Sequence, residues 1–190
     1  MSDGPPRRLV VGITGSSGPQ LGVRLLEVLH DRRDIETHLV LSAGSAESLR
    51  LEMDRTTDSV AKLADICYDV HDLAAAVSSG SFVTMGMVIM PCSMRTLGAI
   101  AAGITGDLVS RAADVCLKER RRLVLVPRET PLNLIHIRNM ETLTLAGATI
   151  VPPVPAFYHR PETIEDLVDH VVGKVLDQFG IEHDLFRRWR

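Results

Sequence analysis

Residues 123–126 read Leu-Val-Leu-Val and are apolar at every position, unlike a strand with one face in water. A strand of this kind is typical of a parallel sheet that helices cover on both faces. A charged pair, Arg128 and Glu129, follows it closely. Ligands of open α/β sheets bind beyond the carboxyl ends of the strands, so this pair is a candidate ligand contact. A solvated ion pair in a loop is an equally good interpretation of the two residues taken alone.

Strand-like and helix-like segments alternate along the whole chain. We predict strands at residues 9–14, 37–41, 66–70, 85–90, 123–126 and 148–151, and helices at residues 21–29, 50–62, 96–102, 111–120, 133–145 and 164–176. This alternation predicts a parallel sheet with helices on both faces, an α/β fold of the Rossmann-like or flavodoxin-like three-layer αβα type. No repeat or linker divides the chain, so we expect a single domain over residues 1–190, with residues 1–7 disordered.

The bulk composition narrows the classes of function. A chain of 190 residues with 45% hydrophobic and 24% charged residues can bury one sizeable core. Its formal net charge of -3 gives no support for a nucleic-acid partner, although an anionic small ligand remains compatible with it. The polar start of the chain lacks the apolar core of a signal peptide, and no apolar run approaches the roughly 20 residues needed to span a bilayer.

The residue types that bind metals show no metal-binding pattern. Cys67, Cys92 and Cys116 match no zinc or redox spacing, and the seven histidines show no metal spacing and no Ser-His-Asp order. We therefore interpret the cysteines as reduced thiols. A cytoplasmic protein without a metal site is the resulting expectation.

A glycine-serine loop, Gly15-Ser16-Ser17-Gly18, lies where the first predicted strand gives way to a helix. Backbone N–H groups and the helix N-terminus can hold a phosphate there, with the serine hydroxyls as further donors. A tight turn that requires positive φ is an equally good interpretation. Dinucleotide sites have an acidic residue near the end of the second strand, whereas this strand ends at Ser42. This difference favours a mononucleotide over NAD.

A second polar turn follows the strand predicted at residues 85–90. It contains Ser93, Met94, Arg95 and Thr96, and it brings two hydroxyls and a first helical turn to the same edge of the sheet. Taken alone, Ser93 is also an ordinary helix N-cap. The turn is therefore a candidate ligand contact only in combination with the glycine-serine loop.

Several charged and phenolic residues are ambiguous by themselves. Arg111 and Lys118 are seven residues apart, so both could point from one helix face toward a phosphate, but a solvated basic face explains them as well. Lys174 flanks an apolar stripe, where lysines commonly extend toward water. Tyr158 is either a packing aromatic or a phenol donor, and Glu52 has the pattern of an ordinary helix-surface acid.

Taken together, these residues resemble the UbiX family of flavin prenyltransferases. The resemblance covers most of the chain from about residue 9 to residue 189 and is carried by GITGSSG with GVRLLEVL, SGSFVTMGMVIMPCSMRTL, RAADVCLKERRRLVLVPRETPL, IHIRNM and VPPVPAFYHRPETIEDLV. The second, third and last of these segments are highly specific. The glycine-serine loop departs from the family's usual pattern at Ser16, Pro19 and Leu21, of which Leu21 replaces an aromatic ring that could wall the flavin or the isoprenoid.

The resemblance implies a role for each candidate residue. FMN would be bound by Gly15, Ser16, Ser17, Ser42, Ser93, Met94, Arg95, Thr96 and Arg128. The phosphate of the prenyl donor would meet Arg111, Lys118, Tyr158 and Lys174, while Trp189, in the tail of residues 180–190 expected at a subunit contact, would close a neighbouring site. Ser17 and Glu52 would act beside flavin N5, and Glu129 would pass a proton to the departing phosphate.

The implied reaction moves a dimethylallyl group from dimethylallyl phosphate or pyrophosphate to N5 and C6 of reduced FMN, without a metal. Its product, prenylated FMN, would serve a UbiD-type decarboxylase, and the family's assembly implies a homo-oligomer, a dodecamer. One alternative is a non-catalytic FMN-binding accessory subunit of a hydroxyarylic acid decarboxylase, which has little need of the catalytic set. A flavin-dependent cysteine decarboxylase is a weaker alternative, because Ser93-Met94-Arg95-Thr96 differs from the turn of that family.

Overall fold

The computed structural model of the protein describes residues 6–189 and contains one six-stranded, all-parallel sheet. The strands are β1 (Arg7–Ile13), β2 (Ile35–Leu41), β3 (Ile66–Tyr68), β4 (Gly86–Cys92), β5 (Arg122–Pro127) and β6 (Thr149–Ile150), in the order β3-β2-β1-β4-β5-β6. This is the strand order of Rossmann-type folds. The predicted α/β fold class is confirmed.

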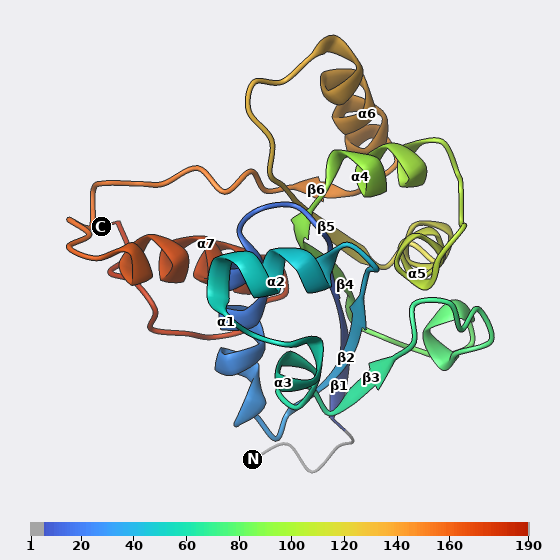
Figure 1. Ribbon diagram of the computed structural model, residues 1–190, viewed down its shortest axis with the longest axis horizontal. Coiled ribbons are helices and arrows are strands. Elements are labelled where there is room, and N and C mark those ends of the chain that lie inside the picture. Colours follow the sequence, from blue (N-terminus) through green and yellow to red (C-terminus); the bar gives the residue numbers. More distant parts are fainter. Residues whose placement is uncertain (1–5, 190) are drawn as a thin grey trace.

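Helices cover both faces of the sheet (Figure 1). They are α1 (Pro19–His30), α2 (Ser45–Met53), α3 (Thr57–Ala61), α4 (Met94–Ala101), α5 (Leu108–Lys118), α6 (Leu134–Leu145) and α7 (Ile164–Gln178), with a short 3₁₀ turn η1 (Ala76–Ser78). One face packs against α1 and α7, and the opposite face against α4 and α5. The C-terminal helix α7 therefore lies beside α1, far from it in sequence.

The core confirms that the central strands are buried on both sides. In β5, Val124 and Val126 face the α1 and α7 side, whereas Leu123 and Leu125 face the α4 and α5 side, and all four are fully buried. Successive side chains of a strand point to opposite faces, so a strand covered on both faces must be apolar throughout. The unbroken Leu-Val-Leu-Val run is the sequence signature of this position.

Several predicted boundaries differ from the observed ones, and two of them change how an element is described. The single helix expected over residues 50–62 is two helices, α2 and α3, because Asp54 adopts the left-handed conformation with φ of 52° and ends α2. The strand expected to stop at Met90 continues through Pro91 and Cys92. Its pairing with β5 shifts register between Ile89 and Cys92, and such an irregularity accommodates a proline that cannot donate to the ladder.

The two ends of the chain differ in what the structure describes. Residues 1–5 of the segment expected to be disordered lie outside the described residues, and Arg7 already pairs with Ile35 in the sheet. After α7 the tail folds back, so that Ile181 is buried against the core.

None of the helices within residues 6–189 combines the length and the apolar character that a membrane-spanning helix requires.

Candidate functional site

The strand order reverses between β1 and β4, and this reversal opens a crevice. The chain leaves β1 for α1 on one face and leaves β4 for α4 on the other, so the two loops diverge at the carboxyl edge of the sheet. A cavity of about 690 Å³ lies there. It is lined by Gly15, Ser42, Ala43, Gly44, Val70, His71, Ser93, Arg95, Thr96, Gly98, Ala99, Ile104, Gly106, Asp107 and Ser110. Its size suits a mononucleotide-sized ligand.

Thr14 joins the two strands at the crevice. Its hydroxyl Oγ1 donates to the carbonyl oxygen of Pro91 and accepts from the backbone N–H of Ser93, each over 2.8 Å. The Thr14 side chain is buried, at 1% exposure, so water cannot reach the Pro91 carbonyl or the Ser93 N–H in place of its hydroxyl. Thr14 is not predictable as a site residue from the sequence, because a threonine at the end of an apolar strand looks like an ordinary strand residue.

We expect Thr14→Val to lower the free energy of unfolding by about 2–4 kcal/mol, because it leaves the Pro91 carbonyl and the Ser93 N–H buried without their partner. The replacement has nearly the same shape, so a cavity does not contribute. Urea denaturation of the flavin-free protein measures this loss. Thr144→Val is the matched control, since the exposed Thr144 hydroxyl bonds only within α6, and a loss of equal size there would contradict the role of Thr14.

The Gly15–Gly18 segment packs tightly against the loop after β2. A Cβ on Gly15 would lie 2.7 Å from backbone atoms of Gly44, so only glycine fits, and Gly18 takes the left-handed conformation with φ of 93°. The turn interpretation of these glycines is thus correct. Ser16 also indicates a ligand-binding role for this loop, because its buried hydroxyl has no hydrogen-bond partner within the described residues. Buried hydroxyls are normally bonded, so Ser16 fits a ligand in the crevice.

The structure brings Ser17 and Glu52 together. The hydroxyl of Ser17 donates to Glu52 Oε2 over 3.1 Å, and the backbone N–H of Gly18 donates to the same oxygen over 2.9 Å. Glu52 comes from the last turn of α2 and is exposed at its surface. A carboxylate that accepts from a serine hydroxyl can hold or remove a proton at that hydroxyl.

The second polar turn forms the N-terminus of α4. Ser93 is the N-cap: its Oγ accepts from the backbone N–H of Thr96 over 3.2 Å. Ser93, Arg95 and Thr96 line the cavity, so an exposed guanidinium and the positive end of a helix meet there. The half-buried Met94 packs against the core instead. The N-cap interpretation and the ligand interpretation of Ser93 are thus compatible.

The capped N-terminus of a further helix, α5, also borders the cavity. The Asp107 carboxylate accepts from the backbone N–H and the hydroxyl of Ser110, each over 2.8 Å. The helix α5 therefore begins at Leu108, three residues before the predicted start. The capping pattern Asp107-x-x-Ser110 was present in the sequence and would have identified both residues.

Arg128 and Glu129 lie at the end of β5, on the same edge of the sheet. The backbone N–H of Arg128 donates to the carbonyl oxygen of Cys92 over 3.2 Å, which ties the pair to the end of β4. Glu129 Oε1 accepts from the backbone N–H of Thr130 over 3.0 Å, and both charged side chains are exposed. Within residues 6–189 the two form no ion pair with each other, so the alternative of a loop ion pair is wrong.

Arg111 and Lys118 share one face of α5, but this face is turned toward η1 and the residues after it. Arg111 Nε donates to the carbonyl oxygen of Ser78, and its guanidinium pairs with Asp114 over 2.9 Å. Lys118 pairs with Glu119 beside Gly80. Neither cation lines the cavity.

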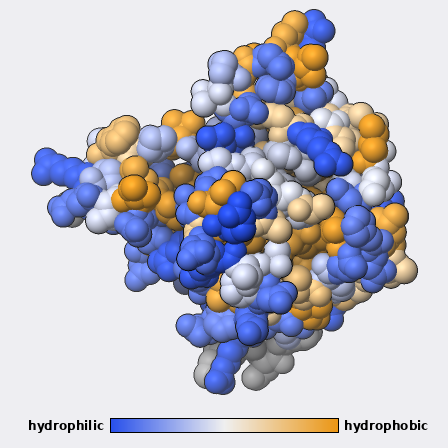
Figure 2. Space-filling view, in the orientation of Figure 1, coloured by the Kyte–Doolittle hydropathy of each residue, from blue (hydrophilic) through white to orange (hydrophobic). Residues whose placement is uncertain are grey.

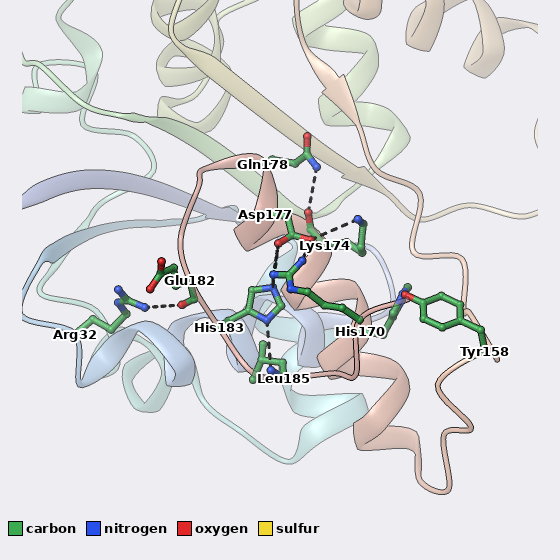
Figure 3. Close-up of polar contacts among 10 residues, drawn as sticks. Arg32, Tyr158, His170, Lys174, Asp177, Gln178, Glu182, His183 and Leu185 are labelled. Carbon is green, nitrogen blue, oxygen red and sulfur yellow. Dashed lines mark hydrogen bonds and ion pairs between the residues drawn. The ribbon is translucent and has the colours of Figure 1, made fainter. Parts of the chain in front are cut away.

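Tyr158 and Lys174 lie on the α7 side of the molecule (Figure 3), and Trp189 packs against Tyr158 there. The rings of Tyr158 and Trp189 meet edge to face with centroids 5.4 Å apart, and Lys174 Nζ lies 3.4 Å from the Asp177 carboxylate. Because α5 and α7 cover opposite faces of the sheet, one chain does not bring these residues together with Arg111 and Lys118 (Figure 1).

The cysteines near the site are buried, protonated thiols. Burial raises the pKa of the Cys92 thiol to about 12, so this group beside Ser93 stays protonated near neutral pH and is a poor nucleophile. All three cysteines are free. Among the described residues, no group of three or more His, Cys, Asp or Glu side chains is arranged to bind a metal ion.

Comparisons with known proteins agree with this fold. The Flavoprotein family model matches residues 2–176. The flavin prenyltransferase UbiX of Escherichia coli (strain K12) is 55% identical over 186 residues, which cover 97% of this chain and 98% of that protein. The crystal structure of AnUbiX (PadA1) in complex with FMN and dimethylallyl pyrophosphate is 52% identical, with a TM-score of 0.95 over 97% of this chain and 98% of that chain. A dodecameric FMN-dependent UbiX-like decarboxylase from Escherichia coli O157:H7 is 53% identical, with a TM-score of 0.95 over 96% of this chain and 99% of that chain.

Proposed function

Because the chain belongs to the UbiX-like family of flavin prenyltransferases, we propose that it transfers a dimethylallyl group from dimethylallyl phosphate or pyrophosphate to N5 and C6 of reduced FMN. The observation that carries this proposal is the crevice between β1 and β4. There the buried hydroxyl of Ser16, which has no hydrogen-bond partner among the described residues, lies in the same loop as Ser17, next to a cavity of about 690 Å³. The hydroxyl of Ser17 donates to Glu52 of α2. Reduced FMN would supply the nucleophilic atoms, and the protein would bind both substrates and handle the protons.

The flavin-binding residues fit the chemistry of FMN. Ser16, Ser42 and the backbone at Gly15 offer uncharged donors at the crevice, and the N-terminus of α4 with Arg95 offers a positive end for the phosphate. Arg128 reaches the same edge of the sheet from the end of β5. Met94, which the resemblance also assigns to FMN binding, packs against the core beneath the turn.

The remaining residues would act on the prenyl donor. Transfer breaks the allylic C–O bond of the donor, so negative charge grows on the departing phosphate and must be met by fixed cations and hydrogen-bond donors. Tyr158 and Lys174 supply a phenol and an ammonium group on one side of the molecule. Glu129 would pass a proton to the leaving oxygen, while Glu52, through Ser17, would accept a proton displaced from the flavin.

A neighbouring copy of the chain would complete the donor site. In one chain Arg111 and Lys118 lie across the sheet from Tyr158 and Lys174, so a set containing all four requires a second chain. A homo-oligomer, with a dodecamer like that of the Escherichia coli O157:H7 relative as the expected form, supplies it. Helix α6, at the top of Figure 1, packs on α4 and leaves apolar side chains exposed for such contacts, and Figure 2 shows orange patches among blue ones in this region. The exposed residues of α6 include Leu134, Ile135 and Leu145.

The deciding experiment incubates the purified protein with reduced FMN and dimethylallyl phosphate without oxygen, followed by mass spectrometry of the released flavin. We expect a gain of one C5H8 unit, and none when the donor is omitted. Bound FMN without a mass gain, for the phosphate and for the pyrophosphate alike, would leave the accessory-subunit alternative. The proposed recipient of the product is a UbiD-type decarboxylase, and the proposed location, which the free cysteines support, is the cytoplasm.

A further inference from the structure

A buried histidine of α7 touches the phenol of Tyr158. Nε2 of His170 lies 3.4 Å from Tyr158 Oη, and the two rings meet edge to face with centroids 5.8 Å apart (Figure 3). His170 is 7% exposed whereas Tyr158 is 42% exposed, so the phenol stands between the imidazole and the solvent. Lys174 follows His170 by one helical turn on α7 and is exposed. The helix thus presents an imidazole behind the phenol and an ammonium group close by.

Packing holds the His170 ring in place. His159 stacks on it with centroids 5.1 Å apart and an angle of 7°, and Phe186 lies 4.8 Å away. Burial lowers the pKa of His170, and the nearby His159 and Lys174 lower it further, since each disfavours a second positive charge. A ring with a lowered pKa is neutral near pH 7 and carries one proton, on one of its two nitrogens.

The hydrogen-bond pattern indicates which nitrogen carries that proton. Nδ1 of His170 is buried without a partner within the described residues. A proton on Nδ1 would make it a buried donor with no acceptor, and buried orphan donors are rarer than buried orphan acceptors. The proton therefore belongs on Nε2, which donates to Tyr158 Oη. A phenol oxygen that accepts this bond has its own proton free to point away from His170, toward solvent or a ligand.

We propose that His170 is a positioning residue for the prenyl substrate. Its Nε2–H donates a hydrogen bond to Tyr158 Oη, so that the phenol O–H is free to donate a hydrogen bond to the phosphate of dimethylallyl phosphate. The inference rests on the proposed function, which assigns Tyr158 to that phosphate. It adds a residue that does not itself reach the ligand. The packing of His159 and Phe186 keeps the His170 ring from rotating. A rotated ring would present its unprotonated nitrogen to Tyr158, and the phenol O–H would then bond to His170 instead of the phosphate.

The test measures two quantities on the FMN-loaded full chain: the Kd of dimethylallyl phosphate by calorimetry, and prenyl transfer with reduced flavin. We expect His170→Phe, which keeps an aromatic ring against His159 and Phe186, to weaken donor binding about tenfold, the size of one lost hydrogen bond, with unchanged FMN affinity. His170→Gln keeps an amide N–H donor at similar reach. Donor binding within about threefold of the wild type is expected for it.

A double-mutant cycle separates positioning from packing. In a Tyr158→Phe background, His170→Phe has no phenol to act on, so its effect on the Kd should disappear. Phe186→Leu is the matched control: it loosens the same ring without removing a polar atom, and its effect should be equal in both backgrounds. Equal losses from His170→Phe with and without the phenol would overturn the inference, as would a Tyr158→Phe variant that binds the donor like the wild type. A wild type that binds the donor without transferring it refutes the proposed function alone, because the cycle in Kd is still measurable.

Discussion

Glu129→Gln is expected to lower prenyl transfer by about 10²–10⁴-fold and to leave FMN affinity within about twofold, since general acid catalysis by one side chain has that size. In the wild type, Glu129 Oε1 accepts from the Thr130 N–H over 3.0 Å. The glutamine amide keeps an oxygen at this position, so we expect the loop after β5 to retain its conformation. It lacks only the proton that a carboxyl group can pass to the departing phosphate. Single-turnover transfer measured by mass spectrometry, with FMN affinity from flavin fluorescence, gives both quantities.

The matched control is Glu47→Gln, which removes an exposed carboxylate paired only with Arg50 on the surface of α2. Such a pair contributes little, so this variant should transfer at the wild-type rate. If Glu129→Gln were equally active, Glu129 would have no part in proton transfer, and the charge at the end of β5 would only hold the loop. A parallel loss of FMN binding would instead make it a flavin-binding residue.

Gly22→Ala is expected to destabilise the protein by about 3 kcal/mol or more, which is roughly 6–12 °C in Tm for a chain of this size. Gly22 lies in α1 where the helix crosses β4, and a Cβ there would be 2.1 Å from the Met90 carbonyl oxygen and 2.9 Å from Ile13. The nearest atom belongs to the backbone, so the helix as a whole must move away from the sheet. The higher helix propensity of alanine, about 1 kcal/mol, acts in the opposite direction and is too small to compensate.

Gly106→Ala is the control for this substitution. Gly106 also lies at the carboxyl edge of the sheet, but beyond its two chain neighbours no other residue has an atom within 4 Å of its added Cβ, so stability should change by less than about 0.5 kcal/mol. Thermal unfolding of the flavin-free proteins compares the two variants. A Gly22→Ala protein as stable as Gly106→Ala would mean that α1 can shift freely on the sheet, and the crevice beside it would then not be rigid.

Much of the fold was predictable because its signals are local. The unbroken apolar run of β5 identified a strand covered on both faces, and the capping box at Thr163 marked the start of α7. Helix ends were less predictable. Nothing local in residues 50–62 announces that Asp54 takes a left-handed conformation, and the break between α2 and α3 was missed.

The site was predictable residue by residue, but its assembly was not. The resemblance selected Ser17 and Glu52, yet only the fold brings the hydroxyl and the carboxylate, 35 positions apart, to 3.1 Å. Thr14 gave no signal, because its importance lies in two bonds to the segment after Met90. Long-range polar contacts of this kind depend on which strand ends are neighbours, and that information is absent from any single segment.

The sequence by itself determined that this chain forms a parallel sheet between helices, with phosphate-binding residue types at the strand ends, since apolar periodicity and turn residues act over a few positions. Only the tertiary structure decided where those ends meet. The order β3-β2-β1-β4-β5-β6 opens the crevice between β1 and β4, and it puts α5 and α7 on opposite faces of the sheet. Right-handed crossovers on either side of a reversal in strand order must cover opposite faces. These crossovers place α1 on one face of the sheet and α5 on the other. Helix α7, which follows the last strand, packs beside α1, so Arg111 and Lys118 lie apart from Tyr158 and Lys174 within one chain.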